Sequence, residues 1–512
     1  MLFNSVVFAL FLPIVFFIYW AIGYTHINEQ LKLRIQNAFV LVASYVFYGW
    51  WDWRFLLLIA FTSFCSWGSG LLIDIRNKGQ RHRSAKAWMV ANIVLNLAIL
   101  AIFKYYDFFA SEFGRLFNLS TDHLLLRIIL PVGISFYTFQ ALSYSIDVYR
   151  QKIEATNDII AFFAFIAFFP QLVAGPIERA TNLLPQFLKN RSFHYAQASD
   201  GMRQILWGLF KKIVIADNCA TYVDQVWSTY TTQSGSTLLL AAILFTFQIY
   251  GDFSGYSDIA IGTAKLFGIK LMRNFNNPYF SRDIAEFWRR WHISLTTWFR
   301  DYVYIPLGGS RPEVPPTMKN PTRYKKWIII RNTFVIFLVS GIWHGANWTF
   351  LAWGAYHALL FLPLILLGVN RKYTNQIGTY IGQDGTEHLR FLPTWHEALQ
   401  MLMTFALVVF GWIIFRAPNI ATCWHYIQGI GDISIFSIPW IISGVYYIPL
   451  VIAITILLIV EWLGRNNEYA LANVPTIKFF QNNALRAILY AFALFVILAF
   501  RGGAVDFIYF QF

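Results

Sequence analysis

Long runs of apolar residues recur along most of the chain, and their length predicts helices that cross a membrane. In the first third of the chain, six such runs follow one another, near residues 4–22, 33–51, 54–73, 87–107, 124–147 and 158–176. A helix needs roughly 20 apolar residues to cross the hydrocarbon core of a bilayer. We therefore expect one span from each run.

The pattern changes after residue 176, where the apolar segments become shorter and carry Gly, Pro and Lys. Two examples are residues 205–216, ILWGLFKKIVIA, and residues 238–268, in which glycines interrupt the apolar run. Non-helical backbone at membrane depth is tolerated only when protein or a water-filled cavity covers it. These segments therefore predict half-helices and re-entrant segments around a cavity.

Full-length apolar runs return in the last third of the chain, near residues 327–343, 347–369, 396–416, 438–463 and 484–500. Residues 370–395 are polar and contain glycine, which predicts a surface loop. No internal repeat, low-complexity tract or linker divides the sequence. We expect an all-α polytopic membrane protein with about ten to twelve spans plus re-entrant and interfacial helices, in a single integral domain over residues 1–512.

The composition supports the membrane assignment. Hydrophobic residues make up 57% of the chain and charged residues only 13%, whereas about a quarter of residues are charged in soluble domains. The net charge of +14 indicates loops that face the anionic cytoplasmic leaflet or an attraction for an anionic cosubstrate, and charge alone does not separate the two. No soluble domain carries this charge, so we expect contact with membrane lipid and no nucleic-acid partner.

Positive charge also predicts the orientation of the chain. Five basic residues and no acidic residue occupy the loop at residues 76–86, which marks this loop as cytoplasmic. Counting back three spans places the N-terminus outside the cytoplasm. Residues 270–331, with twelve basic and four acidic residues, are also expected to be cytoplasmic. The first apolar run lacks a basic leader and a small-residue cleavage site, so we expect it to be retained as a span.

The segment EFWRRWHISLTTWFRDY at residues 286–302 predicts an amphipathic helix with one aromatic face. Arg289 and Arg300 fall on the opposite face, and His292 falls at the edge of the aromatic arc. The helix either lies at the membrane interface, with its arginines at lipid phosphates, or enters a cavity, where the arginines attract a phosphorylated cosubstrate and His292 points inward. The pattern alone leaves both interpretations open.

The apolar segment at residues 327–369 carries a histidine, His344, and only one charged residue, Arg331. A titratable ring at membrane depth is costly and marks a functional site by default, although a polar residue can also join packed helices. The small residues around it, in SGIWHGANW, leave room for a ligand. His344 is the candidate general base, with Trp343 beside it and Asn347 available to orient its ring or a substrate carbonyl.

We hypothesise that His292 and His344 come together in a membrane-buried cavity and carry the chemistry. Asp252 and Asp258, in the segment QIYGDFSGYSD, are further candidates, because buried carboxylates suggest a proton path, a cation site or a partner for Arg or His. A structural ion pair is equally compatible with this pattern. The other histidines, including His357, lie mostly in loops or near span ends and receive no role.

Other chemistries lack their motifs. The chain contains no G-x-x-x-x-G-K-[ST] phosphate loop, no H-E-x-x-H pair and no G-x-S-x-G elbow, which argues against nucleotide-driven pumping, zinc proteolysis and a serine hydrolase mechanism. The three cysteines are isolated from one another and form no C-x-x-C pair. We therefore expect no bound metal and no bound cofactor.

Several segments together resemble one family, the membrane-bound O-acyltransferases. They are SFYTFQALSYSIDVYR at residues 135–150, FFPQLVAGPIERA at residues 168–180, YGDFSGYSDIA, SRDIAEFWRRWHISLTTWFRDYVYIPLGGS at residues 281–310, SGIWHGANWTFLAWG and the terminal FIYFQF. The resemblance covers nearly the whole chain. It is stronger to the bacterial members that take part in the acetylation of alginate, peptidoglycan and cellulose, and weaker to those that export D-alanyl groups to teichoic acids.

The resemblance implies a ring of spans around a thin central partition, where a cytoplasmic funnel and an outer funnel meet at a buried histidine. By position in the motifs, that histidine corresponds to His344, and the second motif histidine corresponds to His292. The resemblance also implies a bacterial cytoplasmic membrane, acetyl-CoA as the cytoplasmic donor, a periplasmic or extracellular SGNH-hydrolase-like partner protein, and a polysaccharide hydroxyl as the acceptor.

On this interpretation, acetyl-CoA docks near residues 270–331, and His344 acts as the general base with His292 and Asn347 as positioning groups. The other predicted substrate contacts are Trp343, Arg289, Arg300 and Asp252. Two alternatives stay open. One is an acyl exporter whose donor is bound to a carrier protein, as in D-alanyl export, and the other is a transporter in which histidines and carboxylates relay protons.

Overall fold

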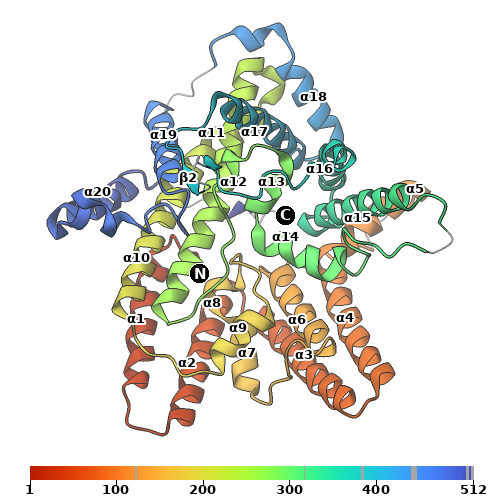
Figure 1. Ribbon diagram of the computed structural model, residues 1–512, viewed down its shortest axis with the longest axis vertical. Coiled ribbons are helices and arrows are strands. Elements are labelled where there is room, and N and C mark those ends of the chain that lie inside the picture. The colour runs from red at the N-terminus through yellow and green to blue at the C-terminus, as the bar shows by residue number, and fades with distance from the viewer. Residues whose placement is uncertain (121–123, 316–317, 382–385, 440–446, 503–506, 509–512) are drawn as a thin grey trace. The chain divides into compact units, whose positions relative to one another are not determined.

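The computed structural model describes residues 1–120, 124–315, 318–381, 386–439, 447–502 and 507–508, and its regular structure is almost entirely helical (Figure 1). Two compact units are formed by non-contiguous parts of the chain. Unit 1 comprises Met1–Leu209 and Tyr256–Met272, and unit 2 comprises Phe210–Gly255 and Arg273–Phe512. The expectation of one integral domain over residues 1–512 stays a prediction.

The helices of unit 1 are α1 (Val6–Gly23), α2 (Glu29–Gly49), α3 (Arg54–Lys78), α4 (His82–Lys104), α5 (Tyr106–Phe117), α6 (Ile134–Tyr149), α7 (Ile159–Ala167), α8 (Phe169–Leu172), α9 (Ala180–Phe187), α10 (Tyr195–Leu209) and the C-terminal part of α12 (Gly235–Leu266). Helices α3, α4 and α6 pack side by side (Figure 1). Gly70 permits this contact, because a Cβ there would lie 2.3 Å from the Tyr144 ring. Asn92 donates from Nδ2 to Ser145 Oγ at 2.7 Å, so buried polar groups also join these helices.

The helices of unit 2 are η1 (Phe210–Ala216), α11 (Asp217–Ser228), η2 (Tyr230–Thr232), the N-terminal part of α12, η3 (Pro278–Phe280), α13 (Ile284–Arg290), α14 (Ile293–Phe299), η4 (Arg300–Tyr304), α15 (Pro321–His344), α16 (Trp348–Leu367), α17 (Trp395–Arg416), α18 (Ile420–Ile430), η5 (Ile433–Phe436), α19 (Tyr447–Leu463), η6 (Val474–Thr476), η7 (Lys478–Gln481) and α20 (Asn483–Ala499). Glycines let α15 and α16 approach closely, since a Cβ on Gly341 would lie 2.3 Å from Phe350 O and one on Gly354 would lie 2.3 Å from Phe337 O.

Strands occur in the described chain only as one short hairpin of unit 2. β1 (Thr379–Ile381) pairs antiparallel with β2 (Glu387–Leu389), and Thr379 lies opposite Leu389. The hairpin falls within residues 370–395, which the sequence predicts as a surface loop.

Seven of the described helices are long and apolar enough to cross a membrane, by length and composition, namely α1, α3, α4, α12, α15, α16 and α17. Two shorter apolar helices cover Ile448–Leu463 and Asn483–Ala499. An all-α polytopic membrane protein is therefore confirmed, with fewer long spans than the ten to twelve expected. The expected ring of spans around a partition with two funnels stays a prediction.

Two spans predicted in the first third are wrong as continuous helices. Over residues 158–176, α7 ends at Ala167, Phe168 adopts an extended ψ of 109°, and Pro170 at the start of α8 has no N–H for the preceding turn. Over residues 124–147, the helix begins only at Ile134, after Gly133 in the left-handed region with φ 75°.

The predicted interruption within residues 238–268 is also wrong, because α12 is one continuous helix of 32 residues. Its internal glycine Gly251 serves packing instead. A Cβ there would lie 2.9 Å from Lys211 O, on the π-helix η1. The glycine thus allows a close approach of two helices in unit 2, which its sequence context alone did not distinguish from a helix break.

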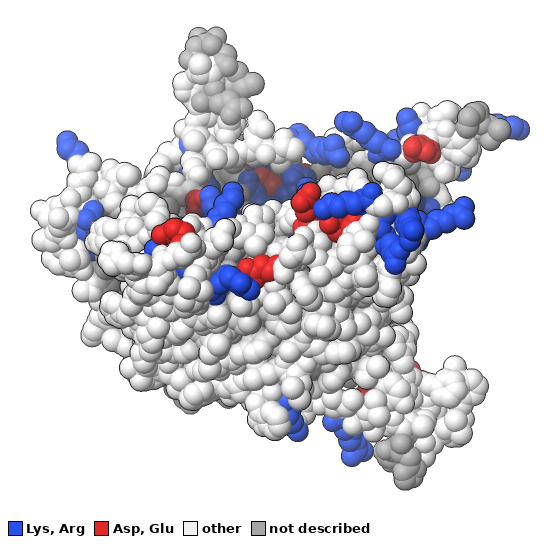
Figure 2. All heavy atoms as spheres, turned by 90° about the horizontal axis from the view of Figure 1, so that it is seen from below, with Lys and Arg blue, Asp and Glu red and all other residues white. Residues whose placement is uncertain are grey.

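The exposed surface of the spans is rich in apolar side chains. Phe17 on α1 is 69% exposed and Leu57 on α3 is 71% exposed. Figure 2 shows wide areas of the visible surface without charged side chains, whereas Lys, Arg, Asp and Glu gather in separate patches. Large exposed apolar areas indicate contact with another apolar phase, which for helices of this length is lipid.

Candidate functional site

His292 interrupts the helix that the aromatic pattern predicts over residues 286–302. Helix α13 ends at Arg290, α14 begins at Ile293, and His292 between them has φ 43° and ψ 54°. This is the left-handed region, which disfavours any residue with a Cβ. The prediction of one continuous amphipathic helix is therefore wrong.

A neighbouring segment satisfies the backbone groups that the break exposes. The N–H of Ile293 donates to Asn274 O at 2.8 Å, and the N–H of Asn276 donates to Arg290 O at 2.9 Å. Ser294 Oγ donates to the side-chain oxygen of Asn274 at 2.9 Å. These long-range bonds explain why helical periodicity failed to predict the break, because periodicity contains only local information.

The ring of His292 is buried against aromatic side chains. It is 1% exposed, and its centroid lies 4.6 Å from that of Phe253 in an edge contact. Burial lowers the pKa of His292 to about 3, because the imidazolium is poorly solvated there. The imidazole is therefore neutral near pH 7. Backbone strain at a buried titratable residue is a recognised feature of functional sites, which strengthens the case for a role.

His344 is the last residue of α15 and lies in a second aromatic cluster. It is 5% exposed, and its ring centroid lies 5.1 Å from that of Trp353 and 5.2 Å from that of Phe415. The next residue, Gly345, is extended, and a Cβ there would lie 2.3 Å from the Phe350 ring. Glycine at this position therefore lets the chain leave α15 close against the Phe350 ring.

Trp343 links the two histidines that the sequence singles out. Its ring centroid lies 5.9 Å from that of His292 and 4.9 Å from that of His344. The structure therefore brings α15 and the break between α13 and α14 together around one indole. The hypothesis that both histidines carry chemistry stays a prediction.

Asn347 organises the turn that follows His344. Its Oδ1 accepts a hydrogen bond from the N–H of Thr349 at 3.0 Å, which caps the start of α16. Its Nδ2 donates to Pro418 O at 2.8 Å, which ties this turn to the loop between α17 and α18. These bonds direct the Asn347 amide to the backbone, so here it positions the chain around His344.

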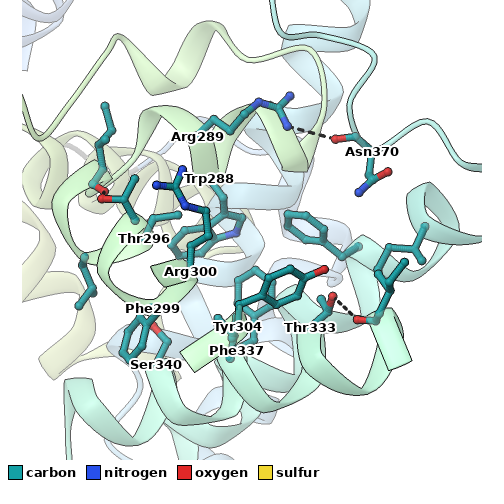
Figure 3. A pocket seen from close by; sticks show the side chains of 17 residues that line it. Trp288, Arg289, Thr296, Phe299, Arg300, Tyr304, Thr333, Phe337, Ser340 and Asn370 are labelled. Atoms are coloured by element: carbon teal, nitrogen blue, oxygen red, sulfur yellow. Dashed lines mark hydrogen bonds between the residues drawn. The ribbon is translucent and has the colours of Figure 1, made fainter. Parts of the chain in front are cut away.

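A cavity of about 460 Å³ lies among α13, α14, η4, α15 and α16 (Figure 3). Its wall is mostly apolar and includes Trp288 and Phe337. The predicted site residues Arg289 and Arg300 line it, as does Ser340, which lies one helical turn before His344 on α15. The other predicted residues, His292, His344, Trp343, Asn347 and Asp252, are not among its lining residues.

A second cavity of about 790 Å³ shares Arg300 and Tyr304 with the first. Arg311 and Arg371 also line it, together with a Gly-Gly-Ser turn at residues 308–310 in which both glycines have positive φ. Arg371 donates to Ser310 Oγ at 3.3 Å. The sequence interpretation missed Arg311 and Arg371. The run PLGGSR is the local signal for Arg311, but Arg371 is 60 residues further along the chain.

Arg289 supports the loop at the rim of the first cavity. Its Nη1 donates to Asn370 O at 3.1 Å and its Nη2 donates to Tyr373 O at 2.8 Å (Figure 3 shows the first of these bonds). Partial burial lowers the pKa of Arg289, but the group keeps its charge because the ordinary value is far above neutrality. Its contact with substrate stays a prediction.

Asp252 forms an ion pair in the interior of unit 2. It is 3% exposed, one oxygen lies 2.8 Å from Lys212 Nζ, and the other accepts from the N–H of Ile508 at 2.7 Å. In unit 1, Asp258 accepts from Gln204 Nε2 at 2.9 Å. Of the roles that the sequence left open for Asp252, these contacts favour the structural ion pair. Within the described residues, no group of three or more His, Cys, Asp and Glu side chains is placed to hold a metal ion.

Comparison with known proteins identifies the family. Residues 86–373 match the model of MBOAT, the membrane-bound O-acyltransferase family. The chain belongs to this family. Both histidines, both cavities and every other predicted site residue fall inside the matched segment. The protein is therefore a membrane acyltransferase, and the transporter alternative loses its support.

Among MBOAT relatives, the chain is 39% identical over 428 residues to the probable alginate O-acetylase AlgI of Pseudomonas aeruginosa, which covers 83% of this chain and 74% of the relative. It is 33% identical over 457 residues to the peptidoglycan O-acetyltransferase of Helicobacter pylori, with 84% and 79% covered. It is 29% identical over 293 residues to the teichoic acid D-alanyltransferase of Streptococcus thermophilus, with 56% and 68% covered. The stronger similarity is thus to MBOAT proteins named for O-acetylation.

Proposed function

We propose that this MBOAT protein transfers an acetyl group from cytoplasmic acetyl-CoA to an extracytoplasmic acceptor, with His344 as general base. One observation carries the proposal. The arginine-lined cavity and the mainly apolar cavity share Arg300 and Tyr304. The apolar cavity reaches Ser340, one turn from His344. The similarity to an alginate O-acetylase and a peptidoglycan O-acetyltransferase supports acetyl as the transferred group.

The two cavities match the two halves of acetyl-CoA. The donor carries an anionic 3′-phospho-ADP and a flexible pantetheine arm that ends in the thioester. Arg311 and Arg371 offer planar donors suited to phosphate oxygens, whereas Arg300 is paired with Asp301 at 2.7 Å. The apolar cavity, of about 460 Å³, suits the narrower arm. We therefore assign the nucleotide to the arginine-lined cavity and the arm to the apolar one.

The proposed chemistry places the His344 imidazole beside the thioester as a proton acceptor. His344 takes the proton of the acceptor hydroxyl as its oxygen attacks the acetyl carbonyl carbon, and an O–C bond forms. The C–S bond then breaks, and the leaving coenzyme A thiolate takes that proton from the imidazolium. The products are an acetyl ester and free coenzyme A. His292, whose imidazole is neutral near pH 7, is assigned a positioning role beside Trp343.

A donor bound to a carrier protein is the second candidate, and the similarity to a teichoic acid D-alanyltransferase favours it. A carrier-bound phosphopantetheine has one phosphate and no adenosine. The cavity of about 790 Å³ is larger than one phosphate requires, and three arginines line it against one acidic residue, Glu313. This size and charge favour free acetyl-CoA.

We further propose a cell-surface polysaccharide hydroxyl, alginate or another glycan, as the final acceptor. A periplasmic or extracellular SGNH-hydrolase-like protein would complete the transfer. The protein would lie in the bacterial cytoplasmic membrane with its N-terminus outside, because the basic loop at residues 76–86 then faces the cytoplasm. The relatives' names support a glycan acceptor, and the orientation rests on charge alone.

Purified protein with labelled acetyl-CoA tests the central claim. We expect slow release of coenzyme A by the wild type, none by His344→Ala, and unchanged release by His425→Ala, which alters an exposed histidine of α18. Both variants must accumulate in the membrane as the wild type does. Normal release by His344→Ala would refute the assignment. Activity with an acylated carrier protein but not with acetyl-CoA would select the second candidate.

A further inference from the structure

His357, to which the sequence pattern assigned no role, contacts the wall of the apolar cavity through Trp288. It lies on α16 and is 1% exposed. The Trp288 indole donates from Nε1 to His357 Nδ1 at 3.3 Å, and the two rings are perpendicular with centroids 5.0 Å apart. Trp288 lines the cavity with Phe337 and Ser340, while His357 lies behind it (Figure 3 shows these three lining residues).

This hydrogen bond fixes the tautomer of His357. An indole N–H can only donate, so Nδ1 must be the acceptor and the ring proton must be on Nε2. If His357 were an imidazolium, its Nδ1–H would face the Trp288 Nε1–H, and two donors would oppose each other. The Nε2 edge is also confined, because a Cβ on Gly411 of α17 would lie 3.0 Å from it. His357 is therefore held as a neutral hydrogen-bond acceptor between two helices.

The same cluster extends from His357 to His344. The Trp353 ring centroid lies 4.9 Å from that of His357 and 5.1 Å from that of His344. It also lies 5.5 Å from that of Trp288. Trp288, which forms the cavity wall, and His344 thus both pack against Trp353. A rotation of Trp288 therefore changes both the shape of the cavity and the packing around Trp353.

We propose that His357 is a positioning residue for the acyl donor, acting through Trp288. Its Nδ1 holds the indole as the wall of the apolar cavity and keeps the path to Ser340 open. Without an acceptor, the buried indole N–H turns toward another polar group, because an unsatisfied buried donor is unfavourable. The turned ring then occupies space that the donor arm needs. This inference rests on the function proposed above.

Two substitutions distinguish loss of the hydrogen-bond acceptor from loss of the imidazole ring. His357→Asn keeps an acceptor near the position of Nδ1, whereas His357→Leu removes it. We expect His357→Leu to raise KM for acetyl-CoA about tenfold or more while kcat falls by less than about threefold, since His344 is intact. His357→Asn should restore most of the wild-type KM. A merely structural role would lower the yield of active protein without this division between KM and kcat.

A double-mutant cycle tests the route through Trp288. Trp288→Phe keeps an aromatic wall but lacks the N–H donor. In that background, His357→Leu should have little further effect on KM, because the bond is already absent. Additive effects, or an Asn variant no better than the Leu variant, would overturn the proposal. If His357→Leu cannot be isolated, the other two variants decide the question. His357→Asn keeps the acceptor and should bind acetyl-CoA nearly as the wild type does, whereas Trp288→Phe lacks the donor and should bind it more weakly.

The outcome is distinguishable from failure of the proposed function. If wild-type protein does not bind acetyl-CoA, or His344→Ala retains activity, the proposed function fails. If His344→Ala is inactive and His357→Leu has a wild-type KM and wild-type acetyl-CoA affinity by calorimetry, only the positioning inference fails.

Discussion

Asp252 accepts a hydrogen bond from the backbone N–H of Ile508 at 2.7 Å, although the two residues are 256 positions apart in the chain. The adjacent Phe507 lies against Phe253, with ring centroids 6.0 Å apart. Phe253 in turn contacts the ring of His292 at 4.6 Å. The buried Asp252 carboxylate thus holds residues 507–508 next to Phe253, and Phe253 in turn contacts the candidate site residue His292.

Replacement of Asp252 by leucine should strongly destabilise the protein. It leaves the buried Lys212 ammonium with fewer partners and the Ile508 N–H without its acceptor, at a cost of about 3–5 kcal/mol. Asp252→Asn keeps an oxygen for the Ile508 N–H and should lose less. Thermal unfolding in detergent compares the two variants. Equal loss in both would contradict an anchoring role for the hydrogen bond.

Substitution of the arginines that line the cavity of about 790 Å³ should weaken binding of a donor that carries phosphates. It should leave binding of a donor without phosphates unchanged. Loss of a charge-assisted hydrogen bond costs about 1.5–3 kcal/mol, so Arg311→Ala and Arg371→Ala should each raise Kd for acetyl-CoA by about 10- to 150-fold. With acetyl-pantetheine, which lacks the nucleotide, the variants should bind as the wild type does.

Calorimetry at low salt measures these affinities. Arg486→Ala, which removes a partly buried arginine of α20 that lines neither cavity, is the matched control and should not change binding. An equal loss for acetyl-CoA and acetyl-pantetheine would mean that the arginines support the fold and do not contact phosphate.

Adding a methyl group at Gly345 should impair chemistry more than donor binding. The new Cβ meets the Phe350 ring at 2.3 Å and displaces the chain next to His344. A shift of about 1 Å in a reacting group can lower the rate about 100-fold, so kcat should fall by that order while Kd for acetyl-CoA changes little.

A second change should relieve the clash. Phe350→Leu in the Gly345→Ala background removes the ring edge and should recover much of kcat. Gly68→Ala on α3, where a Cβ meets nothing within 4 Å, is the control and should behave as the wild type. Failure of Phe350→Leu to restore activity would reject the steric explanation.

His292 should contribute a pH-dependent term to stability. Its pKa is about 3 in the folded protein against an ordinary value of 6.5, so the unfolded chain binds more protons between these values. The free energy of unfolding therefore falls as pH decreases from 6.5 toward 3, by up to about 1.4 kcal/mol per pH unit from this group.

The variant His292→Asn tests this contribution, because asparagine tolerates left-handed backbone and does not titrate. Unfolding curves at several pH values should show a shallower loss of stability on acidification for the variant than for the wild type. Parallel curves would show that His292 is not a buried neutral ring.

Residues near one another in the chain allowed correct prediction of much of this protein. Apolar runs predicted the long helices α1, α3, α4, α15, α16 and α17, because a span is defined by about 20 consecutive side chains. The motifs around His292 and His344 resembled the membrane-bound O-acyltransferases, and the family match confirms that resemblance. These conclusions needed no knowledge of distant contacts.

Tertiary structure decided the features that depend on distant partners. The break at His292 is held by Asn274, and Gly251 lets η1 pack closely against the continuous helix α12. Arg371 joins Arg311 in one cavity, and Trp288 meets His357, only through folding. Local sequence determined which segments are helical and which residues can do chemistry. Long-range hydrogen bonds and close packing determined where helices break and which of those residues meet, because such contacts leave no periodic signal in the chain.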